Sequence, residues 1–131
     1  MIESNKKKLL LIVEDEAIAV KVIAEGLVSE NYEVTVAYDG QEGLEVARVK
    51  HPDLILLDLL MPRLDGMSML KKLRDDDWGK KVPVIILTNL SGISEEKLAD
   101  VSRLEPSYYL IKSNVTMGEI VDKIKEKLEN M

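Results

Sequence analysis

The sequence predicts an α/β fold built on a doubly wound, five-stranded parallel sheet. Short, almost wholly apolar runs recur along the 131 residues, and each is followed by a segment of helical periodicity. Strands that are apolar on both faces and separated by helices are typical of parallel sheets covered on both sides by crossover helices. No internal repeat or linker interrupts this alternation, so we expect one domain over residues 1–131, with a core from about residue 7 to residue 128.

The first two strands are predicted before residue 40. The run "LLLIV" at 9–13 is typical of a strand buried on both faces, and apolar residues between 17 and 28 then repeat at helical spacing. The segment "YEVTVA" at 32–37 alternates like a second strand. Asp39, with Glu42 three residues later, forms a capping-box signature that predicts the start of the second helix.

The other three strands follow the same pattern. "LILL" at 54–57 predicts the third strand, and it precedes a loop with Pro62 and Gly66 and then an amphipathic segment. "VIILT" at 84–88 predicts the fourth strand and "YYLI" at 108–111 the fifth. Each of these two strands is followed by a predicted helix, and the last helix begins with a second capping-box signature, Thr116 and Glu119.

Composition excludes several classes of protein. The net charge of −6 argues against direct nucleic-acid binding, because phosphate contacts need clustered lysine and arginine. The chain has no cysteine, which excludes disulfides and thiolate metal sites. The apolar run at the N-terminus is shorter than a signal peptide requires, and no run approaches the roughly eighteen residues of a membrane helix. We therefore expect a cytoplasmic protein that does not bind membranes.

Chemically reactive side chains stand where the predicted strands end. They are Glu14 and Asp15 after the first strand, Asp58 after the third, Thr88 at the end of the fourth and Lys112 after the fifth. In a sheet of order 2-1-3-4-5 these strands are neighbours, and ligands bind beyond their carboxyl ends, so the side chains should converge. Carboxylates about 4 Å apart repel by about 4 kcal/mol per pair at an effective dielectric near 20, which calls for a divalent cation. Oxygen-only ligation favours Mg²⁺.

This set of groups predicts phosphoryl transfer. The reaction depends on positioning and charge neutralisation, and an aspartate carboxylate can attack phosphorus to form an acyl phosphate. Asp58 is the candidate nucleophile, Lys112 neutralises the phosphoryl oxygens, and the Thr88 hydroxyl is a hydrogen-bond donor. The apolar run around Asp58 is thereby explained, because this acid stands at the rim of the sheet.

From about Lys7 to Leu128 the chain resembles the receiver domains of two-component response regulators, which have a CheY-like, flavodoxin-like three-layer fold. The resemblance rests on four segments in order. They are "LLLIVEDE" with its acidic pair, "LILLDLLMPRLDG" with the acceptor aspartate, "VIILT" with its terminal hydroxyl, and "YYLIK" with its lysine. The family resemblance makes Asp58 the expected phospho-acceptor.

The resemblance also implies roles for the neighbouring residues. Asp15 and Asp58 would bind Mg²⁺ directly, Glu14 would reach the metal through water, and the backbone carbonyl of Leu60 would be a further ligand. Thr88 would bind the phosphoryl oxygen, and Tyr109 would swing inward when the threonine hydroxyl moves. This two-state movement would change the surface formed by the fourth helix, the fifth strand and the fifth helix.

Partners follow from the same resemblance. A sensor histidine kinase or a phosphotransfer protein would donate the phosphoryl group, and a downstream protein would read the changed surface. A phosphorylation-dependent dimer through the fourth and fifth helices is compatible with this scheme. The chain would be a regulatory domain rather than an enzyme, catalysing only its own phosphorylation and dephosphorylation.

Three positions depart from the family pattern. Ser113 follows Lys112 where the family usually has a cis proline, and a cis bond before another residue costs about 2.5 to 4 kcal/mol, so we expect a trans bond and a differently shaped loop. Asn89 and Leu60 flank the phosphoryl site at positions where they should influence access to it. An inactive pseudo-receiver that acts only through protein contacts therefore remains the alternative.

Two other functions on the same fold fit the residues less well. A flavin- or nucleotide-binding protein would need a loop rich in Gly, Ser or Thr after the first strand, whereas "VEDEA" presents three carboxylates there. A phosphohydrolase with an aspartate nucleophile usually has a second acid two residues later, where this chain has Leu60.

Overall fold

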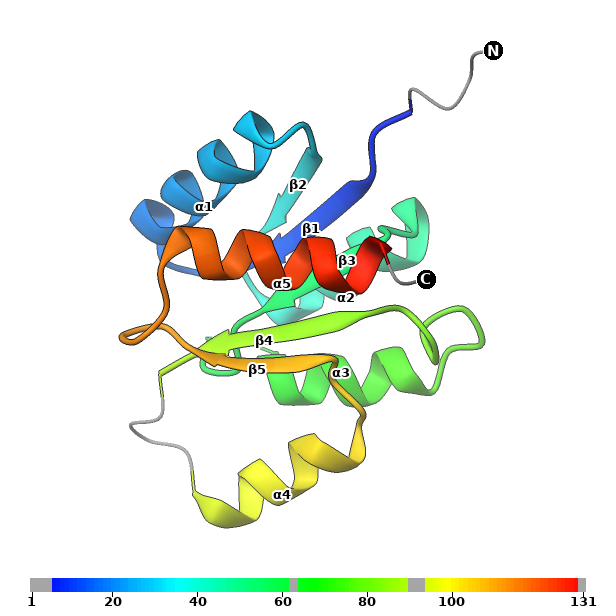
Figure 1. The fold of residues 1–131 in the computed structure, drawn as a ribbon. Coiled ribbons are helices and arrows are strands. Elements are labelled where there is room, and N and C mark those ends of the chain that lie inside the picture. Colours follow the sequence, from blue (N-terminus) through cyan, green and yellow to red (C-terminus); the bar gives the residue numbers. More distant parts are fainter. Residues whose placement is uncertain (1–5, 62–63, 90–93, 130–131) are drawn as a thin grey trace.

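The computed structural model describes residues 6–61, 64–89 and 94–129, and Pro62 of the predicted loop lies outside them. The five strands form one parallel sheet of order β2-β1-β3-β4-β5, which confirms the predicted fold class and strand order (Figure 1). The elements are β1 (Leu9–Val13), α1 (Ala17–Ser29), β2 (Glu33–Ala37), α2 (Gly40–Lys50), β3 (Leu54–Leu57), α3 (Gly66–Arg74), β4 (Val84–Thr88), α4 (Glu95–Arg103), β5 (Tyr108–Ile111) and α5 (Met117–Glu129).

Helices cover both faces of the sheet. In Figure 1, α1 and α5 lie on one face and α2 and α3 on the other, while α4 lies beside the β5 edge. Alternate residues of a strand point to opposite faces, so Leu10 and Ile12 pack in the core under α1 and α5, and Leu11 and Val13 pack in the core under α2 and α3. Hydrophobic cores on both faces explain why the central strands β1 and β3 are apolar at every position, whereas the edge strand β2 alternates.

Two helix starts show the predicted capping pattern in different forms. At α5 the bonds are reciprocal: the Glu119 N–H donates to Thr116 Oγ1 at 3.1 Å, and the Thr116 N–H donates to Glu119 Oε1 at 2.8 Å. At α2 the Glu42 N–H donates to Asp39 Oδ1 at 2.8 Å, but the Glu42 carboxylate accepts from the N–H of Tyr38, one residue before the cap. Both arrangements satisfy backbone donors that a helix leaves free at its first turn.

The sheet brings the carboxyl ends of its central strands to one edge. The Asp58 N–H donates to the Val13 carbonyl at 3.0 Å, so the residue after β3 lies beside the end of β1. The Lys112 N–H donates to the Thr88 carbonyl at 2.9 Å, which places the residue after β5 beside the end of β4. None of the helices described here combines the length and apolar character that crossing a membrane requires.

Candidate functional site

Asp58 is a buried carboxylate with donors on both oxygens. Its Oδ1 accepts a 2.7 Å hydrogen bond from the Thr88 hydroxyl and a 3.2 Å bond from the Leu60 N–H. Its Oδ2 lies 3.2 Å from Lys112 Nζ. Removing a carboxylate from water costs several kcal/mol unless partners of this kind replace the solvent. The structure therefore brings together Asp58, Thr88 and Lys112 as the sequence predicted.

Gly66 allows the chain to fold back over Asp58. The Gly66 N–H donates to the Leu59 carbonyl at 3.1 Å, and a Cβ added to this glycine would lie 2.0 Å from the backbone oxygen of Asp58. Such a contact is far inside van der Waals distance, so a side chain cannot be accommodated unless the loop moves. This close approach is the physical reason for a glycine eight residues after the aspartate.

The ammonium of Lys112 is shared by three carboxylates. It forms ion pairs with Glu14, with Glu16 Oε1 at 3.1 Å and with Asp58 Oδ2 at 3.2 Å. Burial on its own lowers the pKa of Lys112, but the hydrogen bond to Glu14 and the charge of Asp58 outweigh it, so that the pKa is raised and the ammonium form is favoured. Sequence reasoning did not assign Glu16 to the site, although a third consecutive acid after β1 is a visible signal.

Three acids at this edge can hold a metal ion. Glu14, Asp15 and Asp58 each offer one oxygen, and these three oxygens lie within 4.8 Å of one another. Burial raises the pKa of Glu14, opposed by hydrogen bonds from Lys112 and from the Glu16 N–H. Asp15 is exposed to solvent. An oxygen-only set with one face open to water fits Mg²⁺, which keeps several of its waters when bound to protein.

The family model described as "Response regulator receiver domain" matches residues 10–125. This chain belongs to the response regulator receiver family. It is therefore a receiver domain of two-component signalling, which is a regulatory domain.

Similar proteins support this assignment. A probable transcriptional regulator, ycf27 of Cyanophora paradoxa, is 38% identical over 71% of this chain, and the match spans 37% of that protein's length. A CheY-like receiver domain protein from Methanospirillum hungatei JF-1 has a solved structure with a TM-score of 0.87 at 27% identity, covering 95% of this chain and 96% of that one. The receiver domain of sensor histidine kinase PA1611 from Pseudomonas aeruginosa PAO1, solved with a magnesium ion coordinated in its active site cleft, has a TM-score of 0.83 at 27% identity, covering 95% and 99%.

The receiver domain departs from the family pattern after β5, but its lysine is still aimed at the site. No cis peptide bond occurs in the described part of the chain, so the bond before Ser113 is trans as predicted. The Asn114 N–H donates to the Ile111 carbonyl at 2.9 Å, closing a turn that leads to α5. Since Lys112 reaches Asp58 with this loop in place, the serine does not misdirect the ammonium. Asn89, next to Thr88, is exposed.

Tyr109 points into the protein. Its ring packs against the core under α2 and α3, and its phenol oxygen is buried with no hydrogen-bond partner among the described residues. Burial and the negative charge of Asp58 raise the pKa of this phenol. Tyr108 takes the other face of the sheet, where its hydroxyl donates to Glu126 Oε2 at 2.8 Å. The two tyrosines are thus distinguished by their faces, as the alternation of a strand requires.

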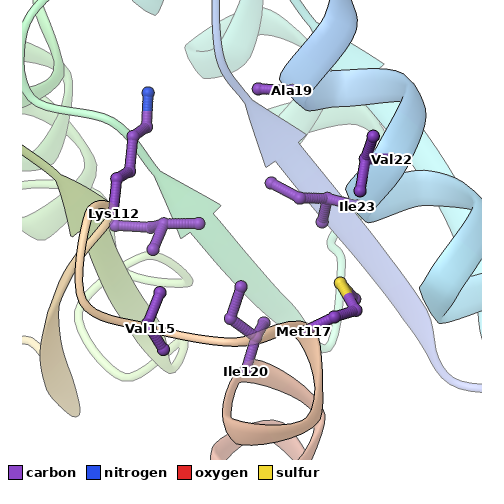
Figure 2. Close-up of a pocket in the computed structure, with 8 residues that line it drawn as sticks. Ala19, Val22, Ile23, Lys112, Val115, Met117 and Ile120 are labelled. Carbon is purple, nitrogen blue, oxygen red and sulfur yellow. The ribbon is translucent and has the colours of Figure 1, made fainter.

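An apolar pocket of about 300 Å³ lies beside the hydrocarbon stem of Lys112. Its other walls come from α1, from β4, from the loop before α5 and from the start of α5: Ala19, Val22, Ile23, Leu87, Val115, Met117 and Ile120. Figure 2 shows the lysine stem along one side of this space, with its nitrogen at the edge. The stem is therefore packed against apolar groups while the ammonium is directed toward the carboxylates, rather than extended freely into water.

Proposed function

We propose that this receiver domain is a phospho-accepting switch and that Asp58 is the acceptor. The observation that carries the proposal is the Asp58 carboxylate held between the Thr88 hydroxyl and the Lys112 ammonium, beside two further acids. All of the groups expected of an active receiver are present, which disfavours the alternative of a pseudo-receiver. The donor would be a histidine kinase, a phosphotransfer protein or a small phosphodonor.

With acetyl phosphate as donor, an Asp58 oxygen attacks the phosphorus in line. A new P–O bond forms on Asp58, the P–O bond to the acetyl group breaks, and acetate leaves with the electron pair, so no proton is transferred. Lys112 offsets charge on the phosphoryl oxygens and the Thr88 hydroxyl donates to one of them. In dephosphorylation, water attacks the phosphorus and the P–O bond to Asp58 breaks. The carboxylate leaves with the electron pair, and inorganic phosphate carries away the oxygen and both protons of the water.

The acidic cluster would hold Mg²⁺. Glu14, Asp15 and Asp58 supply oxygens close enough to share one ion, and the backbone carbonyl of Leu60 would complete the protein ligands. When bound, the metal would neutralise negative charge on the acids and on the phosphoryl oxygens. The magnesium ion in the PA1611 receiver domain supports this choice of metal.

The output would pass through the surface of α4, β5 and α5. Thr88 and Tyr109 would couple the site to this surface, and α4 is suited to movement because Val101 is its only buried residue. A downstream protein would read the change, and a phosphorylation-dependent dimer through α4 and α5 is a second form that the output can take. These events would take place in the cytoplasm, without direct binding to nucleic acid or membranes.

The test is incubation with acetyl phosphate and Mg²⁺, followed by the mass of the intact protein. We expect a gain of one phosphoryl group, which is lost in Asp58→Asn and in the presence of a metal chelator. Asp122→Asn, which neutralises an exposed aspartate of α5, is the matched control and should be phosphorylated like the wild type. A wild-type mass that stays unchanged with several small donors would favour the pseudo-receiver.

A further inference from the structure

The ammonium of Lys112 has no free donor in this structure. An ammonium carries three N–H groups. Lys112 lies within ion-pair distance of three carboxylates, those of Glu14, Glu16 and Asp58. If Lys112 is to bind a phosphoryl oxygen, as the proposed function requires, one of these three interactions has to be given up.

Burial decides which interaction is cheapest to break. The side chains of Glu14 and Asp58 are only 3% and 6% exposed, whereas that of Glu16 is 65% exposed. In the absence of bound Mg²⁺, a buried carboxylate that loses its ammonium partner pays a large desolvation cost. An exposed carboxylate is rehydrated at once, and such a pair contributes little to stability. Glu16 is therefore the partner that Lys112 can exchange.

The side chain of Glu16 does not cap the helix that follows it. Glu16 is the N-cap residue of α1, but its carboxylate makes no capping hydrogen bond. Its backbone N–H donates to Glu14 Oε2 at 3.1 Å, which fixes the loop, and its side chain is directed at Lys112 across the end of the sheet. Attraction to the helix N-terminus alone would not place the carboxylate there.

We infer that Glu16 is a positioning residue that occupies Lys112 in the unphosphorylated receiver and releases it to the incoming phosphoryl group. This inference rests on the proposed function of Asp58 and Lys112. Glu16 would thereby slow phosphorylation, because its ion pair with Lys112 is present before the reaction and absent after it. Removing the Glu16 carboxylate should therefore speed phosphorylation and leave the lifetime of the phosphorylated form unchanged.

The experiment compares wild type, Glu16→Gln, Glu16→Ala and a charge control. Glu25→Gln neutralises an exposed acid on the same helix, and no contact between Glu25 and Lys112 is formed. Phosphorylation with Mg²⁺ is followed by intact mass, using acetyl phosphate and, separately, the less highly charged donor phosphoramidate. Decay is followed after the donor is removed. We expect both Glu16 variants to be phosphorylated about two- to five-fold faster with either donor, the range that corresponds to an exposed ion pair, and Glu25→Gln to match the wild type.

Other outcomes would overturn the inference. Equal rates for wild type and the Glu16 variants would mean that the ion pair does not hinder the reaction. Acceleration with acetyl phosphate alone, or in Glu25→Gln as well, would show that the variants act through the overall negative charge of the protein and not through the ion pair with Lys112. A phosphoryl lifetime altered as much as the rate would show that Glu16 still holds Lys112 after phosphorylation. Failure of the wild type to gain a phosphoryl group would instead refute the proposed function itself, so the two failures are distinguishable.

Discussion

The hydroxyl of Thr88 donates a 2.7 Å hydrogen bond to Oδ1 of Asp58, and both side chains are buried at the carboxyl edge of the sheet. Hydrogen bonds to charged groups contribute about 1.5 to 3 kcal/mol, so this one helps to fix the orientation of the carboxylate. Thr88 is therefore placed to influence both the acceptor and the phosphoryl group that forms on it.

Replacing Thr88 by valine should slow phosphorylation of Asp58 by about tenfold or more, because the hydroxyl is lost while the shape is kept. Thr88→Ser retains the hydroxyl and should stay within about threefold of the wild type. The measurement is the initial rate with acetyl phosphate, read from intact mass. A valine variant as fast as the serine variant would mean that the hydroxyl is dispensable.

Magnesium should stabilise the folded domain through the acidic cluster. A ligand that binds only the folded state stabilises it by about 1.4 kcal/mol at ten times its Kd, so the Tm of the wild type should rise with Mg²⁺ concentration. Asp15→Asn removes one candidate ligand and should lose most of this rise, whereas the surface variant Asp122→Asn should keep it. The comparison is thermal unfolding followed by circular dichroism over a magnesium titration. An undiminished rise in Asp15→Asn would argue against that residue as a ligand.

The fold could be predicted because the evidence for it is local. The strands β1 and β3 are apolar at every position, β4 is apolar up to Thr88, and β2 alternates. Each strand is followed by a segment with the apolar periodicity of a helix, so the parallel sheet follows from the order of segments. The convergence of Asp58, Thr88 and Lys112 could be predicted as well, since the strand order alone brings these three strand ends together. The apolar periodicity of a helix was a less reliable guide to which side chains are buried. Val28 belongs to the apolar pattern of α1, yet it is 56% exposed.

What could not be predicted depends on side-chain conformation across long sequence separations. The ion pair of Glu16 with Lys112 joins residues 96 positions apart, and sequence alone offers the helix N-terminus as an equally good partner for the acid. The inward position of Tyr109 depends on which face of β5 turns toward α2 and α3. Two adjacent tyrosines carry no pattern that separates them, so the choice of Tyr109 over Tyr108 rested on the family resemblance alone.

Gly66 should not tolerate a side chain, because a Cβ there would lie 2.0 Å from the Asp58 carbonyl oxygen. We expect Gly66→Ala to lower the free energy of unfolding by about 2 kcal/mol or more and to slow phosphorylation by displacing Asp58. Gly118→Ala is the matched control in α5, where the nearest atom to the new Cβ would be Thr116 Oγ1 at 3.8 Å. This control should be neutral or stabilising by up to about 1 kcal/mol. Urea unfolding of both variants is the measurement, and equal stabilities would contradict the steric argument.

Arg74, near the C-terminal end of α3, joins two loops through its guanidinium group. It donates to four backbone carbonyls at 2.8 to 3.0 Å, two in the loop before β4 and two directly after α4: Gly79, Val82, Leu104 and Glu105. The planar guanidinium presents several N–H donors in fixed directions, which suits these four carbonyls. A lysine ammonium could donate to only some of them. We expect Arg74→Ala and Arg74→Lys to lower the free energy of unfolding by about 2 to 4 kcal/mol and 1 to 3 kcal/mol.

The matched control for Arg74 is Arg103→Ala. Arg103 pairs with Asp100 at 2.8 Å on the exposed side of α4, and an exposed pair of this kind contributes about 0.5 kcal/mol or less. Hydrogen exchange measured by mass spectrometry should show faster exchange at the end of α4 in Arg74→Ala, because the carbonyls of Leu104 and Glu105 lose their donor there. Arg74 and Arg103 variants of equal stability, with equal exchange in α4, would show that the guanidinium does not anchor this helix.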